Sequence, residues 1–172
     1  ATETRNQRER RGSAGVGGRT HEIQRLIGRT LRAVCDLTVL GERTITLDCD
    51  VLQADGGTRT AAISAAWVAL QLACYTLMKK QLIQINPIKK QLAAISVGKL
   101  NEEVLLDLCY QEDSAAEVDM NVVMTDEGAF VEVQATGEEA TFTKVQMKDM
   151  LDVAEKGIRE IFLLQLEALR RS

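Results

Sequence analysis

The sequence predicts an α+β fold in which helices pack against a small, mainly antiparallel sheet. Three observations support this prediction. An alternation of polar and apolar residues runs through two glycines into a helical pattern, several short aliphatic runs follow one another, and a long helical pattern closes the sequence. We find no internal repeat. We therefore predict one domain over residues 19–172, preceded by a basic flexible segment at residues 1–18.

A helical pattern opens the predicted domain. Its apolar positions keep three- and four-residue intervals up to Gly41, and they are Ile23, Leu26, Ile27, Leu31 and Val34. Arg25, Arg29 and Arg32 lie off this stripe, so we expect them to be exposed. His21 begins the helix and is the only histidine, which excludes two-histidine nuclease chemistry and most serine-triad chemistry. We expect His21 to be a surface residue.

A strand pattern and a second helical pattern meet at Asp55-Gly56-Gly57, which we call the glycine turn. Before the turn, apolar residues alternate with polar ones and predict a strand with one buried face, formed by Ile45, Leu47, Cys49 and Val51. After the turn, helical spacing begins close to Thr58 and continues to about Lys80. Trp67 lies on the apolar stripe of this helix, so we expect it in the core and not as a base-stacking platform.

The remaining elements form the predicted sheet and its covering helix. After a break at Asn86-Pro87, aliphatic runs predict strands at residues 92–99, 103–109, 118–125 and 129–136, with residues 126–128 joining the last two. Thr143 and Gln146 have capping-box spacing, and Phe142 is placed to contact Met147. The last helix therefore begins near Thr143, and its pattern extends to about Leu169, interrupted by Gln165.

Composition limits the classes of function. The 172 residues are 45% hydrophobic but only 3% aromatic, which predicts an aliphatic core and disfavours a nucleic-acid surface built on stacked rings. The net charge is −4, yet the first 20 residues carry five arginines against two glutamates. Such a basic segment suits local contact with a polyanion, and a solvated tail is an equally good interpretation of its composition.

The cysteines and the apolar runs indicate the cellular setting. Cys35, Cys49, Cys74 and Cys109 are widely spaced, without a C-x-x-C pair, so we expect buried reduced thiols and no zinc site. No apolar run reaches membrane-spanning length, and the sequence starts with polar residues and arginines. We therefore expect no membrane partner and a cytoplasmic location.

The glycine turn is a candidate anion site. A helix start binds an anion through its free N–H groups and its dipole, which is worth roughly 0.3 to 2 kcal/mol, and one charge-assisted contact from Arg59 adds about 1.5 to 3 kcal/mol. On spacing alone, the better-supported alternative is a turn whose glycines only allow positive φ, with Arg59 solvated at the surface.

Asp113 and Asp119 form a candidate acidic pair. They are six residues apart, on either side of a short polar link between two predicted strands. Paired carboxylates can hold magnesium through oxygen ligands, or one can stay protonated beside the other and act as an acid. Two unrelated surface acids are the favoured alternative without further information.

Three stretches of the sequence resemble the ribonuclease PH family. They are Gly18 to Arg29, Asp50 to Thr60 and Glu112 to Met124, in the family's order, and the resemblance extends from about Thr4 to the end of the chain. The resemblance implies the ribonuclease PH fold, which is similar to the second domain of ribosomal protein S5. Members of the family normally carry further strands before this point, so we expect an N-terminally incomplete member whose isolated chain is unstable or depends on a complementing segment.

The resemblance also assigns roles to individual residues. Arg19, Gly57, Thr58 and Arg59 match positions that bind inorganic phosphate in the family, and Asp113 and Asp119 match its metal-binding and acid candidates. Of the two acids, Asp119 is our choice for protonating the leaving oxygen and Asp113 for binding magnesium, although coupled carboxylates can share these roles. Arg5 and Arg8 match arginines that contact the RNA backbone.

The implied activity is phosphorolysis from the 3′ end of RNA. Inorganic phosphate attacks the last phosphodiester of a transfer RNA precursor and releases a nucleoside diphosphate, and the reverse reaction adds nucleotides. Family members form homohexamers, as trimers of dimers. The alternative from another class is a non-catalytic RNA-binding ring subunit of an exosome-like assembly. Such relatives typically lack the arginine or the acidic pair, and this sequence has both.

Overall fold

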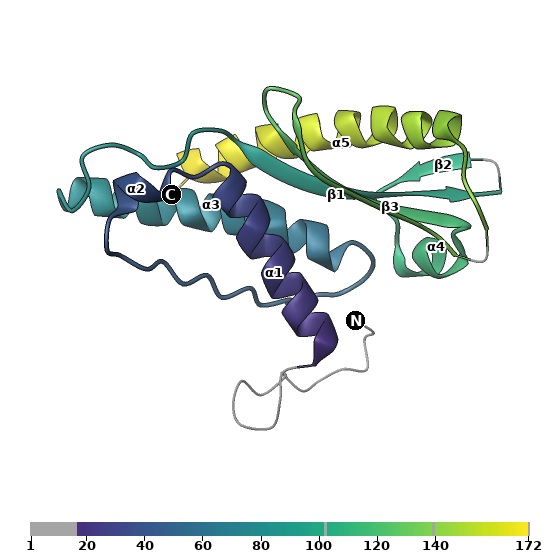
Figure 1. Cartoon of the computed structure of the whole chain (residues 1–172), viewed down its shortest axis with the longest axis horizontal. Coiled ribbons are helices and arrows are strands. Elements are labelled where there is room, and N and C mark those ends of the chain that lie inside the picture. Colours follow the sequence, from purple (N-terminus) through teal and green to yellow (C-terminus); the bar gives the residue numbers. More distant parts are fainter. Residues whose placement is uncertain (1–16, 102, 139, 172) are drawn as a thin grey trace.

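A computed structural model describes residues 17–101, 103–138 and 140–171 and shows an α+β architecture (Figure 1). The helices and strands follow in the order α1 (Gly18–Ala33), α2 (Leu37–Leu40), α3 (Thr58–Lys79), β1 (Leu92–Leu100), β2 (Glu103–Leu106), α4 (Tyr110–Ala115), β3 (Val118–Thr125), β4 (Phe130–Gly137) and α5 (Lys144–Arg170). The predicted fold class is confirmed.

The four strands form one antiparallel sheet in the order β2-β1-β3-β4. The long pairing of β1 with β3 runs from Leu92 opposite Thr125 to Lys99 opposite Val118. β2 is shorter than the run at 103–109 predicts. It ends at Leu106 because Asp107 adopts a left-handed φ of 57°, which turns the chain out of the strand.

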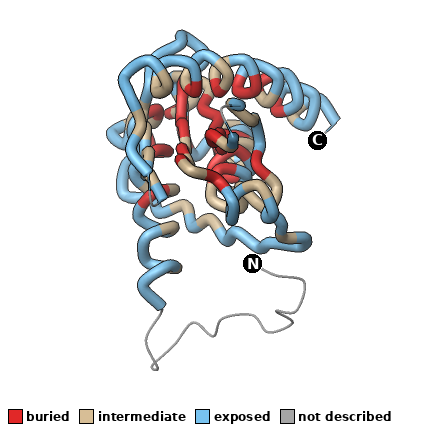
Figure 2. Tube along the Cα trace, turned by 90° about the vertical axis from the view of Figure 1, so that its right-hand side faces the viewer, coloured by how far each residue is buried: buried red, intermediate tan, exposed pale blue. Residues whose placement is uncertain are grey.

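The sheet lies between two helical layers (Figure 1). Alternate residues of β1 point to opposite faces. Ala93, Ile95 and Val97 belong to a core cluster under α5, whereas Leu92 and Ala94 belong to a second cluster with α1 and α3. Figure 2 shows the buried residues concentrated in the strands between the covering helices.

The last helix begins where its sequence predicts. The Thr143 hydroxyl accepts a hydrogen bond from the Gln146 backbone N–H at 3.2 Å, and the Thr143 N–H donates to Gln146 Oε1 at 2.8 Å. Gln165, which interrupts the apolar stripe, is buried and donates to the carbonyl oxygens of Ser64 and Leu92 at 2.9 and 3.0 Å. This polar contact ties α5 to α3 and to β1.

The helix α3 is the central core helix of the other layer. Trp67 is 4% exposed, and its indole N–H donates to the Lys90 carbonyl at 3.1 Å, which confirms its core assignment. By length and composition α3 is apolar enough to cross a membrane, so the expectation that no run reaches that length is wrong. Because Ile63, Trp67 and Cys74 pack into the core beside the sheet, burial accounts for part of the apolar composition of α3, and 39% of its apolar window is buried.

The first predicted helix is interrupted before it reaches Gly41. α1 ends at Ala33, and a separate short helix, α2, follows. The Val34 carbonyl accepts a hydrogen bond from the Lys89 N–H, and the Asp36 N–H donates to the Pro87 carbonyl, each at 2.8 Å. These contacts with a segment distant in sequence replace the helical hydrogen bonds that the local spacing favours.

The predicted strand before the glycine turn is absent. No strand is assigned at residues 45–51, because a strand needs the backbone of a neighbouring strand, and none of the described strands pairs with this segment. Ile45 and Leu47 still pack against the core cluster of α1 and α3, but Cys49 and Val51 are exposed. The alternation of polar and apolar residues therefore belongs to an extended segment in which only Ile45 and Leu47 pack against the core.

The expectation of buried cysteines is correct for only one residue. Cys74 is buried, Cys35 and Cys109 are half-buried, and Cys49 is exposed. All four are free thiols. Burial raises the pKa of the Cys74 thiol to about 11, so this thiol stays protonated at neutral pH.

Candidate functional site

The glycine turn brings the start of α3 against the start of α4. Asp55 Oδ1 accepts a hydrogen bond from the Tyr110 N–H, the first residue of α4, at 2.5 Å. A Cβ atom on Gly56 would lie 1.8 Å from the Leu108 carbonyl oxygen, so only glycine permits this close approach. The turn therefore joins the candidate anion site to the helix that carries Asp113.

Gly57 leaves the start of α3 open. It is the N-cap residue, its φ is 63°, and no side chain caps this helix start. The first N–H groups of a helix have no partner within the helix, and they favour an anion together with the dipole. Thr58 and Arg59 occupy the first two positions of α3. The predicted phosphate-binding residues Gly57, Thr58 and Arg59 thus form one continuous helix start.

The Arg59 guanidinium lies between α3 and α1. Its Nη1 is 3.7 Å from Glu22 Oε1 on α1. Its Nε is buried and has no hydrogen-bond partner within residues 17–101, 103–138 and 140–171. Since a guanidinium carries five N–H donors, this side chain keeps capacity to bind an anion. The solvated surface arginine that spacing alone allows does not describe a residue with a buried Nε.

Asp119 lies on β3, opposite Gly98 of β1, and its side chain is half-buried. Burial is the largest cause that raises the pKa of its carboxyl, and the negative charges of Asp113 and Glu138 raise the pKa further. The positive charge of Arg59 acts in the opposite direction. Asp119 Oδ1 is also buried without a partner among the described residues. Arg59 and Asp113 are therefore each within electrostatic reach of Asp119.

A short helix that the sequence analysis did not predict carries Asp113. The Cys109 N–H donates to Glu112 Oε2 at 2.9 Å, and this capping contact begins α4 at Tyr110. Asp113 is exposed near the middle of α4, while Asp119 follows on β3. The two acids therefore lie on a helix and on the strand that follows it, and the charge of Asp113 raises the pKa of the Asp119 carboxyl.

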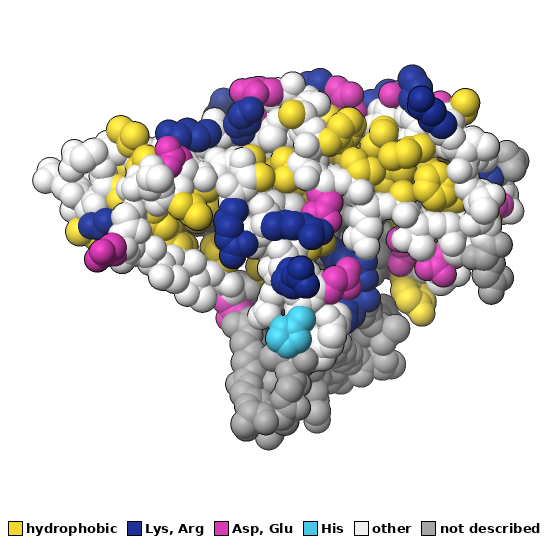
Figure 3. Space-filling model, in the orientation of Figure 1, with side chains coloured by type: hydrophobic (Ala, Val, Ile, Leu, Met, Phe, Trp, Pro, Cys, Tyr) yellow, Lys and Arg dark blue, Asp and Glu magenta, His cyan; other side chains and the backbone are white. Residues whose placement is uncertain are grey.

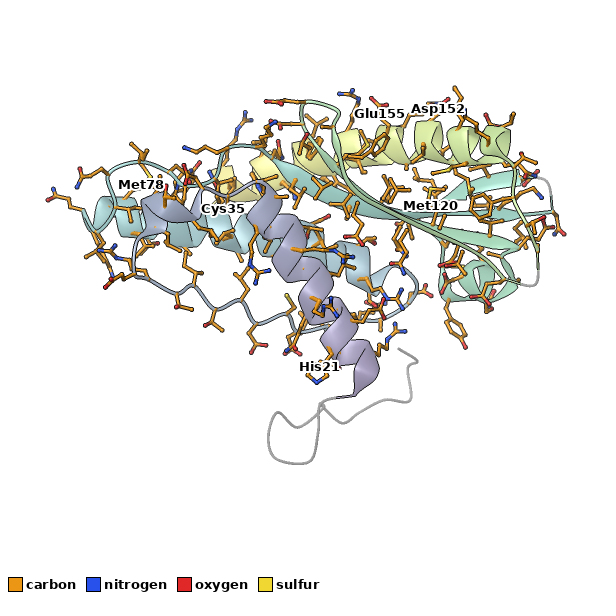
Figure 4. All side chains as sticks on the ribbon, in the orientation of Figure 1. His21, Cys35, Met78, Met120, Asp152 and Glu155 are labelled. Carbon is orange, nitrogen blue, oxygen red and sulfur yellow. The ribbon has the colours of Figure 1, made fainter. Side chains whose placement is uncertain are left out.

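The other predicted residues lie at the margin of this arrangement or outside the described chain. Arg19 is exposed in the first turn of α1, three residues before Glu22, so both lie on one side of the helix. Arg5 and Arg8 lie outside the described residues. His21 is exposed, as expected, and Figure 4 shows it at the lower end of α1. In Figure 3, Lys and Arg side chains gather over the same helix.

Four residues near the site were missed by the sequence analysis: Glu22, Ser96, Asp107 and Glu138. A Cβ atom on Gly57 would lie 3.2 Å from Ser96 Oγ and 3.5 Å from Asp107 Oδ1, so both side chains face the glycine turn. Ser96 offers a signal in the sequence, because it is a polar residue inside a continuous apolar run. The other three depend on tertiary contacts.

The acidic pair fits one mode of magnesium binding. No group of three or more His, Cys, Asp or Glu side chains in the described part of the chain is arranged to hold a metal ion. Magnesium usually binds through one or two carboxylates together with substrate phosphates and water. Asp119, with its unpartnered buried Oδ1, and Asp113 can supply the protein share of such a site, but not an all-protein cage.

Two family models match the chain: domain 1 of the 3′ exoribonuclease family over residues 1–75, and domain 2 of the same family over residues 90–157. The chain belongs to the 3′ exoribonuclease family.

Within that family, the chain is similar to proteins named ribonuclease PH. It is 58% identical over 170 residues to the one from Corynebacterium glutamicum and 60% identical over 171 residues to the one from Bacillus cytotoxicus, and each match covers 98% of this chain and 69% of the relative. These matches confirm the predicted activity, a phosphate-dependent 3′-to-5′ exoribonuclease of the nucleotidyltransferase type. They do not favour the non-catalytic alternative.

Solved structures support the fold. Rice Rrp46 has a TM-score of 0.64 at 18% identity, and the match covers 91% of this chain and 68% of Rrp46. The Archaeoglobus fulgidus exosome with RNA bound to the active site has a TM-score of 0.64 at 17% identity and covers 87% of this chain and 63% of the solved chain. The predicted ribonuclease PH fold is confirmed.

Proposed function

We propose that this protein trims the 3′ ends of transfer RNA precursors, with inorganic phosphate held at the glycine turn as the attacking group. One observation carries the assignment of the site: the partly buried Arg59 guanidinium lies at an uncapped helix start, within electrostatic reach of Asp119. Positive charge is needed there because the reaction brings one phosphate anion against another.

In the proposed reaction, a phosphate oxygen attacks the phosphorus of the last phosphodiester. The bond from this phosphorus to the 3′ oxygen of the preceding ribose breaks, the 3′ oxygen takes a proton, and a nucleoside diphosphate leaves. Asp119 donates that proton. Burial and the charge of Asp113 raise the pKa of Asp119, which increases the protonated fraction available for this step.

Asp113 would mainly hold magnesium between the protein and the substrate phosphates, and Asp119 would share in binding the ion when its carboxyl is ionised and does not carry the proton that it donates. A bound magnesium ion neutralises charge that builds on the phosphate oxygens. The unpartnered Oδ1 of Asp119 supports this proposal, since a buried carboxylate oxygen without a donor favours a cation.

The RNA would be bound through its backbone by Arg5 and Arg8, whereas Arg19 would bind inorganic phosphate together with Arg59. Contacts of arginine with phosphate are salt-sensitive and carry no base preference, which suits an enzyme that removes any terminal nucleotide. We further propose a homohexamer, built as a trimer of dimers, in the cytoplasm. The exposed apolar residues Leu163, Leu164 and Leu166 on α5 offer surface that subunit contacts can bury.

The decisive experiment incubates a 3′-extended transfer RNA precursor with the protein and magnesium, with and without inorganic phosphate. Phosphate-dependent release of nucleoside diphosphates, resolved by ion-exchange chromatography, is the expected result. Nucleoside monophosphates in phosphate-free buffer would mean hydrolysis and contradict the mechanism. An unrelated RNA of equal length with the same 3′ extension tests the substrate, because equal trimming of both would contradict a preference for transfer RNA precursors.

A further inference from the structure

We infer that the Ser96 hydroxyl is an additional ligand of the anion at the glycine turn. This inference rests on the proposed function, because the anion it concerns is the inorganic phosphate of the reaction. Ser96 lies in the middle of β1, directly beneath the turn, and no motif in the sequence analysis includes it. Three observations support the assignment.

The first observation is that the hydroxyl is buried without a partner. Ser96 is 5% exposed, and its Oγ has no hydrogen-bond partner in the described part of the chain. Ser64, a similarly buried serine, shows the usual arrangement, because its Oγ donates to the Ala94 carbonyl at 3.1 Å and accepts from the Ala94 N–H at 3.0 Å. Leaving a buried hydroxyl unsatisfied is unfavourable, so the Ser96 hydroxyl needs a partner other than the described residues.

The second observation is the direction of the hydroxyl. A Cβ atom on Gly57 would lie 3.2 Å from Ser96 Oγ, which means that the hydroxyl points at the residue preceding α3. The backbone of Ser96 is fixed, since its carbonyl accepts the Asp107 N–H at 2.8 Å. An anion bound by the first N–H groups of α3 would therefore lie beside a serine held in position.

The third observation is that other unpartnered atoms lie nearby. Gly98, two residues after Ser96, pairs with Asp119, so Ser96 and Asp119 share one face of the sheet as diagonal neighbours, typically about 7–8 Å apart. Arg59 Nε and Asp119 Oδ1 are likewise buried without partners among the described residues. A tetrahedral phosphate has enough oxygens to accept from the Ser96 hydroxyl, from Arg59 and from the backbone at once.

The test measures the binding of inorganic phosphate by isothermal titration calorimetry, and the unfolding midpoint with and without phosphate. For Ser96→Ala we expect phosphate affinity to fall about ten-fold or more, as for the loss of a hydrogen bond to a charged group. The midpoint without phosphate should stay equal or rise, because the substitution removes a buried hydroxyl that has no partner. Ser96→Cys keeps the volume with a weak donor and should lose affinity as well.

Ser64→Ala is the matched control. It removes a buried serine hydroxyl that does have partners, so it should lower the midpoint without phosphate and leave phosphate affinity unchanged. The inference is overturned if Ser96→Ala binds phosphate as tightly as the unsubstituted protein, or if the unsubstituted protein binds none. Weaker binding by Ser96→Ala in a protein that releases no nucleoside diphosphate from RNA would support the inference while refuting the proposed function.

Discussion

The two faces of the sheet differ in how completely their polar groups are satisfied. The face under α5 is apolar in the main, with Met120, Met150 and Ile158 fully buried. Within the described residues, the buried side-chain atoms without partners all lie on α3 or on the sheet face toward α3, and they belong to Arg59, Gln71, Ser96 and Asp119. The α5 face thus stabilises the protein, whereas one end of the α3 face keeps polar groups available for a ligand.

The two long helices that cover these faces also differ at their starts. The first N–H groups are capped in α5 and uncapped in α3, as the polar groups are satisfied on one face and not on the other. α5 has its first N–H groups bound by its own side chains, through Thr143 and Gln146. α3 starts at Gly57 without a side-chain cap. Unpaired N–H groups at a helix start require some partner, and for α3 we propose that the partner is the substrate anion.

Among the substitutions that test the difference between the two faces, Arg59→Ala should have the largest effect. Removing a donor aimed at the reacting phosphate should reduce kcat/KM for phosphorolysis by about 10²–10³-fold, because the reaction brings two anions together. The measurement is nucleoside diphosphate release at several phosphate concentrations. Arg29→Ala is the matched control, since Arg29 also lies on the α3 side but is exposed and pairs with Glu132 on β4. Equal losses in both variants would remove Arg59 from the proposed site.

Substitutions in the core between α5 and the sheet should have the largest effect on stability. Ile158 lies on α5 and is fully buried against the sheet, so Ile158→Ala should lower the free energy of unfolding by about 2–5 kcal/mol through lost apolar burial and a cavity. Urea unfolding followed by circular dichroism measures the loss. Phosphate affinity under native conditions should be unchanged, and a large drop in affinity would show that the two faces are coupled.

Two glycines with left-handed backbone allow a finer test. Gly57 has φ 63° and Gly128 has φ 81°, so alanine at either position should cost about 1–2 kcal/mol of backbone strain. Only at Gly57 does the added Cβ face other side chains, since nothing lies within 4 Å at Gly128. Gly57→Ala should therefore also weaken phosphate binding in calorimetry, and Gly128→Ala should not. Equal phosphate affinity in the two variants would argue against an anion at the glycine turn.

The sheet and the long helices were predictable because their signals are local. The aliphatic runs that became β1, β3 and β4, and the capping box at Thr143, are each contained within a few residues. Signals that require a partner far away in the sequence were misread. The helix expected up to Gly41 is broken by contacts with residues 87–89, and the strand expected at residues 45–51 pairs with none of the described strands.

The candidate site was only partly predictable for the same reason. The motifs that contain Arg59, Asp113 and Asp119 can be recognised in the sequence, and the structure brings Arg59 and Asp113 each within electrostatic reach of Asp119. Ser96 belongs to no motif, and its importance depends on the register that sets Gly98 opposite Asp119 and on the path of the glycine turn above β1. Its polarity inside an apolar run is visible in the sequence, but its position beside the glycine turn follows only from tertiary geometry.

The smallest expected effect concerns the pH dependence of stability. Because the folded protein raises the pKa of Asp119 above its ordinary value of 3.8, Asp119 contributes stability that is fully present below that value and is lost as the pH rises through the raised pKa. The free energy of unfolding of the unsubstituted protein, relative to Asp119→Asn, should therefore fall as the pH rises above about 3.8. Urea unfolding of both proteins at several pH values measures this difference. A difference that rises with pH would mean that the Asp119 carboxylate is stabilised as an anion, which would contradict its proposed role as the proton donor.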